Sequence, residues 1–97
     1  MRHVFFVKKE NKSRAEDALK KDDRVSRQSI VLRECVAMGF KDDGYFIIID
    51  SSDEAMKKAE ELLHGLAEKY KHAKDVLKRF DESEQDAAEG LGMILGG

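Results

Sequence analysis

The residues best suited to chemistry in this chain are three histidines and one cysteine, and they are scattered along it. His3, His64 and His72 are scattered without the spacing of a ligand pair, and Cys35 has no second cysteine. Structural zinc sites are usually encoded by Cys or His pairs a few residues apart, so we expect no zinc site. Nothing beside Cys35 in the sequence would lower the pKa of its thiol, and we expect it to be a small buried residue.

Motifs for phosphate binding and for acyl transfer are missing from the sequence. None of the patterns GxxxxGK[ST], GxGxxG and GxSxG occurs. Two acidic clusters, Asp42-Asp43 and Asp50–Glu54, flank one predicted strand and so lie about 20 Å apart, too far to share a cation. We therefore predict no catalytic residue, no cofactor and no metal site, and the protein is expected not to be an enzyme.

One short stretch is basic and rich in hydrogen-bond donors. It contains Arg24, Arg27 and Arg33, with Gln28 and two serines between them. Guanidinium groups suit phosphate oxygens, so these four side chains form a candidate site for an anion or an RNA backbone. No aromatic residue is interleaved with them, so base stacking is not indicated, and a solvated polar surface is the alternative.

Composition favours one folded domain over residues 1–97. Hydrophobic residues make up 41% of the chain and charged residues 39%, which indicates an apolar core under a strongly charged surface. The formal net charge is −2 without a basic tail, so net charge implies neither nucleic acid nor a membrane surface as partner. The single cysteine fits a reducing compartment, and we expect a cytoplasmic protein.

The segment Gly44–Asp50 is the most apolar and β-branched run, which is typical of a strand covered on both faces. Further strands are predicted over residues 3–9 and 66–71, with continuation of the preceding helix as the alternative for residues 66–71. Helices are predicted from Ser13 to Lys21, from Ser51 to about residue 63, and over residues 73–89. Asn11 and Ser13 are the two candidate caps of the first helix; Ser13 with Glu16, and Ser51 with Glu54, have the spacing of a capping box.

Residues 25–38 fit two patterns. As a strand, Ile30, Leu32, Val36 and Met38 share a face; as a helix, Val31, Cys35 and Met38 align. We favour the helix, because Gly39 followed by Phe40 resembles a helix end that needs a left-handed glycine. The same ending recurs at Gly65 and Gly90.

The predicted class is α+β, with a three- to four-stranded sheet covered by helices. If residues 25–38 form a strand instead, the order over residues 3–71 becomes β-α-β-β-α-β, the ferredoxin-like order, with a C-terminal helix added.

The chain ends in Gly96-Gly97, which resembles the end of ubiquitin-like modifiers and sulfur carriers. That resemblance implies a carrier whose terminal carboxylate is adenylated and then thiolated or conjugated. It covers only the last residues, and the family's fold opens with a β-hairpin, whereas here a helix is predicted directly after the first strand.

The leading hypothesis is a non-enzymatic interaction or regulatory domain, because no catalytic or cofactor constellation can be assembled. The expected partner is another protein or a second copy, bound through an exposed strand edge or the C-terminal segment. RNA binding and the carrier role are the alternatives.

Overall fold

The computed structural model describes residues 2–82 of the chain. The elements in this range are β1 (Arg2–Lys8), η1 (Lys9–Asn11), α1 (Lys12–Lys21), α2 (Asp23–Ser26), β2 (Ser29–Glu34), η2 (Val36–Met38), β3 (Gly44–Asp50), α3 (Asp53–Leu63) and β4 (Ala67–Lys69). The elements η1 and η2 are single 3-10 turns. A further helix, the C-terminal helix, is described over residues 73–82.

The strands form one antiparallel sheet in the order β2-β3-β1-β4. Helices α1 and α2 connect β1 to β2, and α3 connects β3 to β4. The chain order β-α-β-β-α-β is that of the ferredoxin-like arrangement. The predicted α+β class is confirmed, and the alternative architecture, with a helix added after β4, is the one found.

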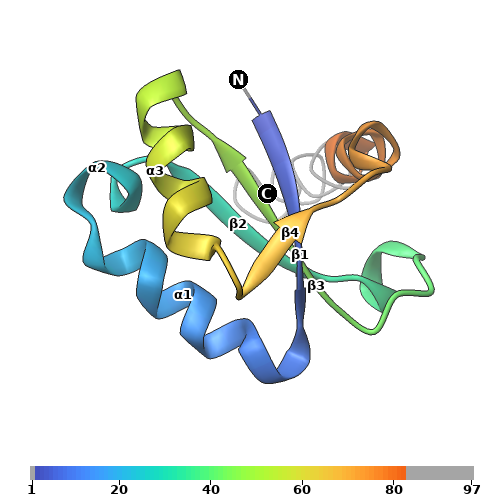
Figure 1. Ribbon diagram of the computed structural model, residues 1–97. Helices are drawn as coiled ribbons and strands as arrows, with labels where there is room; N and C mark the ends of the chain where they lie inside the picture. The colour runs from blue at the N-terminus through green and yellow to red at the C-terminus, as the bar shows by residue number, and fades with distance from the viewer. Residues whose placement is uncertain (1, 83–97) are drawn as a thin grey trace, which may run out of the picture.

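Helices cover both faces of this sheet (Figure 1). One face carries α1, α2 and α3, and the other carries η2 and the C-terminal helix. On β3, Ile47 and Ile49 point into the first layer, whereas Phe46 and Ile48 point into the second. The expectation that this strand is covered on both faces is confirmed.

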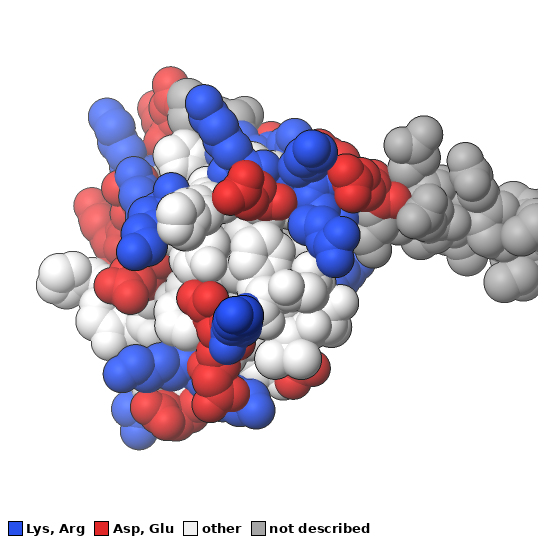
Figure 2. All heavy atoms as spheres, turned by 90° about the vertical axis from the view of Figure 1, so that its right-hand side faces the viewer, with Lys and Arg blue, Asp and Glu red and all other residues white. Residues whose placement is uncertain are grey.

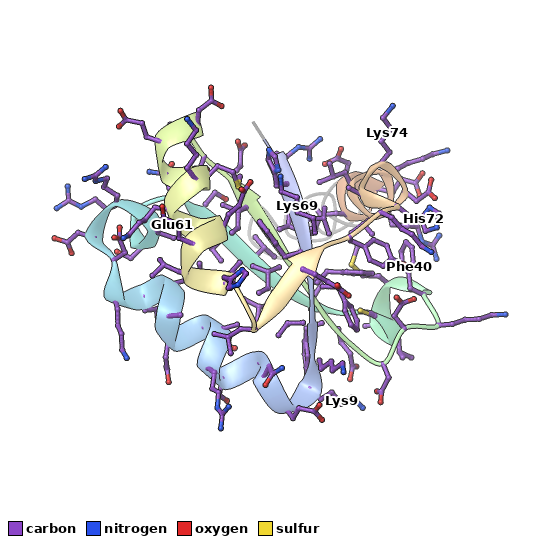
Figure 3. The ribbon with its side chains drawn as sticks, viewed as in Figure 1. Lys9, Phe40, Glu61, Lys69, His72 and Lys74 are labelled. Atoms are coloured by element: carbon purple, nitrogen blue, oxygen red, sulfur yellow. The ribbon has the colours of Figure 1, made fainter. Side chains whose placement is uncertain are left out.

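The second layer is rich in aromatic rings, with Tyr70 at their centre. The Tyr70 ring centroid lies 4.8 Å from that of Phe46, 6.2 Å from that of Phe40 and 6.4 Å from that of Phe6. Figure 3 shows Phe40 and His72 on this same side, beside η2 and the C-terminal helix. Most of these rings meet edge to face, the arrangement that their quadrupoles favour.

The helix favoured for residues 25–38 is wrong. Only Asp23–Ser26 is helical at its start, Ser29–Glu34 is strand β2, and Val36–Met38 is one 3-10 turn. As a strand, the segment pairs its backbone with β3 and divides its side chains between the two layers, Ile30 and Leu32 to one and Val31 to the other. A helix here would leave β3 without a neighbour on this side.

Gly39 has φ 86° and Gly65 has φ 80°, so both adopt the predicted left-handed conformation. Gly39, however, ends the turn η2 and not a long helix. Arg79 of the C-terminal helix contacts this turn in two ways. Its Nε donates a hydrogen bond to the Met38 carbonyl oxygen (3.1 Å), and its guanidinium group lies against Gly39. Gly90 lies outside the described residues.

Two helices begin one or two residues away from the predicted capping boxes. The N-cap of α1 is Asn11, the other of the two predicted caps, so Ser13 lies inside the helix. The N-cap of α3 is Ser52, whose hydroxyl accepts a backbone N–H from the first turn, whereas the Ser51 hydroxyl donates to the Ser52 carbonyl oxygen. Neighbouring serines can exchange this role, so spacing alone did not fix the start.

Gly44 begins β3 at a point where the sheet and an aromatic ring leave no room for a side chain. A Cβ atom at this position would collide with the Val7 carbonyl oxygen and would lie 2.9 Å from the Phe6 ring. The Phe6 ring therefore covers the bare backbone of Gly44. Gly65 differs, because its φ is positive but nothing lies within 4 Å of such an atom.

We expect Gly44→Ala to lower the free energy of unfolding by about 3 kcal/mol, because a backbone oxygen cannot move aside as a side chain can. Gly65→Ala is the control, and it should cost only about 1 kcal/mol, the strain of a left-handed alanine. Urea unfolding measures both values. A Gly44→Ala variant no less stable than Gly65→Ala would contradict this account.

Candidate interaction site at the edge of the sheet

The two outer strands of the sheet differ in length and charge. β4 has three residues, and its Glu68 and Lys69 are exposed. β2 has six residues, and its uncharged middle, Ile30 to Leu32, is only half-buried. Natural sheets protect their outer strands by shortness and charge. β4 has both protections, while β2 carries charge only at its end, so the outer edge of β2 is the candidate interaction site.

Hydrogen bonds to β3 determine which backbone groups of β2 point inward. The Cys35 N–H donates to the Gly44 carbonyl oxygen (3.0 Å), at the end of the ladder that joins the two strands. Hydrogen-bonded pairs alternate along antiparallel strands. Arg33 and Val31, two and four residues before Cys35, therefore direct their N–H and C=O groups toward β3.

The alternate residues Ile30, Leu32 and Glu34 direct their N–H and C=O groups away from the sheet. Within residues 2–82, no strand pairs with these groups. The Leu32 carbonyl oxygen accepts a hydrogen bond from Nη1 of its neighbour Arg33 (3.2 Å). This edge therefore offers a row of backbone donors and acceptors to another extended chain.

A groove of about 230 Å³ runs beside this edge on the helix side of the sheet. Its floor is apolar, formed by Leu19 of α1 with Ile30 and Leu32 of β2. Polar side chains form its rim: Glu16, Lys20, Ser26 and Gln28. An apolar side chain of an added strand would lie over this floor, on the same face as Ile30 and Leu32.

The rim of the groove carries one acid and one base, both from α1. Lys20 Nζ lies 3.9 Å from Glu16 Oε2. In Figure 1, α1 and β2 run in opposite directions. Lys20, nearer the end of α1, therefore lies nearer the start of β2 than Glu16 does. The charge along this edge thus changes sign from the start of β2 toward its end.

The structure divides the four predicted anion-binding residues between the two faces of the sheet. Arg24 and Arg27 lie on α2 and at its C-terminal cap, on the helix side, and both are exposed. Gln28 donates from Nε2 to the Arg24 carbonyl oxygen (3.1 Å) and also lines the groove. Arg33 points to the opposite layer, where its guanidinium lies 5.5 Å from the centroid of the Phe80 ring.

The histidines and Cys35 do not converge. Among residues 2–82, no group of three or more His, Cys, Asp or Glu side chains could hold a metal ion. Cys35 is fully buried in the second layer, and burial raises the pKa of its thiol to about 11, with Asp42 contributing. His72 is exposed and stacks edge-on against Tyr70, with 5.9 Å between ring centroids.

Tyr70 is a second polar feature of the aromatic layer. Its hydroxyl donates to Asp42 Oδ1 (3.3 Å), and burial together with that carboxylate raises the pKa of the phenol. Figure 2 shows the side of the molecule that carries η2 and the C-terminal helix, with uncharged surface at its centre and charges of both signs around it. The rings here pack on one another and Tyr70 is hydrogen-bonded, so the cluster serves as core.

The apolar residues of the groove, Leu19, Ile30 and Leu32, are not among the site residues predicted from the sequence. The signal was present, because Ile30 and Leu32 alternate with Val31 and Arg33 as in a strand with two different faces. The left-handed glycine after them favours a helix and conflicts with that alternation.

Comparison of the chain with protein-family models, curated proteins and solved structures finds no match. In the described part of the chain, no helix has the length and apolar character needed to span a bilayer.

The raised pKa of Cys35 predicts how stability depends on pH. At a pH below 9.0, the ordinary pKa of the thiol, Cys35 is protonated in both the folded and the unfolded state, so its ionisation does not affect the free energy of unfolding. Between pH 9 and about 11 the unfolded thiol ionises first, so the free energy of unfolding should fall, by up to about 2 kcal/mol from this residue.

Urea unfolding from pH 8 to pH 11, for wild type and Cys35→Ala, measures this contribution. Tyr70 titrates in the same direction and is common to both proteins, so the difference between the two curves isolates Cys35. Parallel curves for the two proteins would show that burial does not raise the thiol pKa.

Proposed function

We propose that this chain is a non-enzymatic interaction domain that receives an extended protein strand along the outer edge of β2. The observation that carries this proposal is the contrast between the two sheet edges: one short and charged, the other long, uncharged in its middle and bordered by an apolar groove. Backbone hydrogen bonds would supply affinity, and the groove would select apolar side chains at alternate positions of the bound strand.

The location of the groove supports strand addition over contact with a helix or a flat surface. Its floor includes Ile30 and Leu32, which are also the residues whose backbone groups point outward. A strand that pairs with these groups brings its own side chains over the same floor, because directly opposed residues of antiparallel strands share a face. Main-chain and side-chain recognition are thus available at one place.

Binding of an RNA backbone through Arg24, Arg27 and Arg33 has less support. Two of these arginines lie on the helix side of the sheet, while Arg33 lies on the other side against Phe80. The central strand β3 carries two aromatic residues: Phe46 is fully buried beside Phe40 and Tyr70, and the half-buried Tyr45 ring has the Lys12 ammonium group 4.9 Å from its centroid. The carrier hypothesis depends on Gly96-Gly97, which lie outside the described residues.

A charge on the edge of β2 should abolish strand binding while the domain stays folded. In Ile30→Lys, the ammonium group can reach water at the polar groove rim, but it would stand against any strand entering the groove. Ala67→Lys places the same charge at a half-buried site on β4 and is the matched control. We expect at least about tenfold weaker binding for Ile30→Lys and no change for Ala67→Lys.

The probe is a displayed library of random peptides of strand length, selected against the wild-type protein. Hydrogen exchange of the selected complexes gives the second readout: the outward amides of Ile30, Leu32 and Glu34 should become protected, whereas those of Val31 and Arg33 are already protected by β3. Peptides that bind both lysine variants equally, or that protect only other amides, would refute the site.

A further inference from the structure

We propose that the strand received by β2 is β2 of a second copy of this chain, antiparallel to it, with a twofold axis passing beside Val31. The two sheets then join into one continuous sheet, and the helix layers α1–α3 of both copies lie on the same side. This inference rests on the proposed function, and it adds the identity of the partner and the register of pairing.

The backbone restricts where the axis can lie. Only outward-pointing residues can exchange hydrogen bonds across the edge, so each must face another outward-pointing residue. An axis between two consecutive residues is excluded, because each residue whose N–H and C=O point away from β3 would then face a residue whose N–H and C=O point toward β3. An axis at Val31 pairs Ile30 of each copy with Leu32 of the other, and both point outward.

Side chains distinguish Val31 from its neighbours as the position of the axis. With the axis at Val31, Ile30 of one copy faces Leu32 of the other, so two apolar side chains are opposed. Glu34 of one copy then faces Gln28 of the other, and both of these side chains are polar. With the axis at Leu32, Ile30 would face the carboxylate of Glu34. With the axis at Ile30, the paired segment would reach past Gln28 into α2, and the ladder would be shorter.

The charges on the groove rim suit an antiparallel pair of copies. Because α1 runs opposite to β2, Lys20 lies nearer the start of β2 than Glu16 does, and both line the groove with Ile30 and Leu32. Antiparallel pairing of the two β2 strands therefore brings the Lys20 end of one rim toward the Glu16 end of the other, twice across the interface, which is a complementary arrangement of charge.

Two adjustments accompany this pairing. The Arg33 guanidinium leaves the Leu32 carbonyl oxygen, which then accepts from the Ile30 N–H of the second copy. Arg33 then faces Ser29 of that copy, a hydroxyl acceptor. The Gln28 N–H already donates to the Val25 carbonyl oxygen (3.0 Å), so the new ladder ends there.

A cysteine at the axis tests the register. In Val31→Cys, combined with Cys35→Ala, the two new thiols belong to a directly opposed pair with Cα atoms about 4.5 Å apart, within the range of a disulfide. Mild oxidation of the purified full chain should yield covalent dimers. Leu32→Cys in the same background is the control, and its thiols would be diagonal neighbours about 7–8 Å apart. Faster cross-linking of Leu32→Cys than of Val31→Cys would overturn the register.

A charge swap tests the rim contacts without touching β2. Lys20→Glu alone should raise the dimer dissociation constant about fivefold, because two like-charged contacts replace two favourable ones. The double variant Glu16→Lys with Lys20→Glu restores both the contact within α1 and the contacts between copies, so it should return to the wild-type value. No recovery in the double variant would contradict the proposed contacts.

Sedimentation of the wild-type chain separates this inference from the proposed function. Dimers that dissociate on dilution and are lost in Ile30→Lys are expected. A strict monomer at about 1 mM, a concentration at which even weak specific pairs form, would overturn self-pairing. If that monomer still binds selected peptides along β2, the proposed function stands with another protein as partner; if it binds none, both fail.

Discussion

Both faces of the central strand β3 carry apolar side chains that must be buried, and the arrangement of the other elements depends on this constraint. Phe46, Ile47, Ile48 and Ile49 alternate between two layers, and all four are almost completely buried. One layer of helices cannot cover both sides of a sheet. The chain therefore places α1, α2 and α3 on one side and brings η2, Tyr70 and the C-terminal helix over the other. Two small cores share one strand.

Much of this architecture could be predicted from periodicity. The run Gly44–Asp50 indicated an interior strand, the stripe from Ala55 to Leu63 indicated α3, and the positive φ of Gly39 and Gly65 was expected from their positions. Residues 25–38 could not be assigned in this way, because a short apolar run fits both periods. Residues 29–34 form a strand because they pair with β3. The local residue pattern does not show this pairing, so it could not decide between helix and strand.

The candidate site was harder to predict than the fold, and the reason is physical. Arginines and histidines draw attention in a sequence because their chemistry belongs to the side chain. An open sheet edge acts through backbone groups that every residue has, and only topology shows that β2 is outermost. Exposed strand edges were proposed as contacts, but Ile30 and Leu32 could be identified only once the strand order was known.

The bond from Arg79 to the Met38 carbonyl oxygen joins two parts of the chain that lie far apart in sequence. Cys35 lies immediately before the turn that this bond holds, and it has no exposed surface. A reagent can reach that sulfur only when the loop and the C-terminal helix part from each other. The rate at which Cys35 is labelled in the folded protein therefore measures how often η2 and the C-terminal helix separate locally, without unfolding of the whole domain.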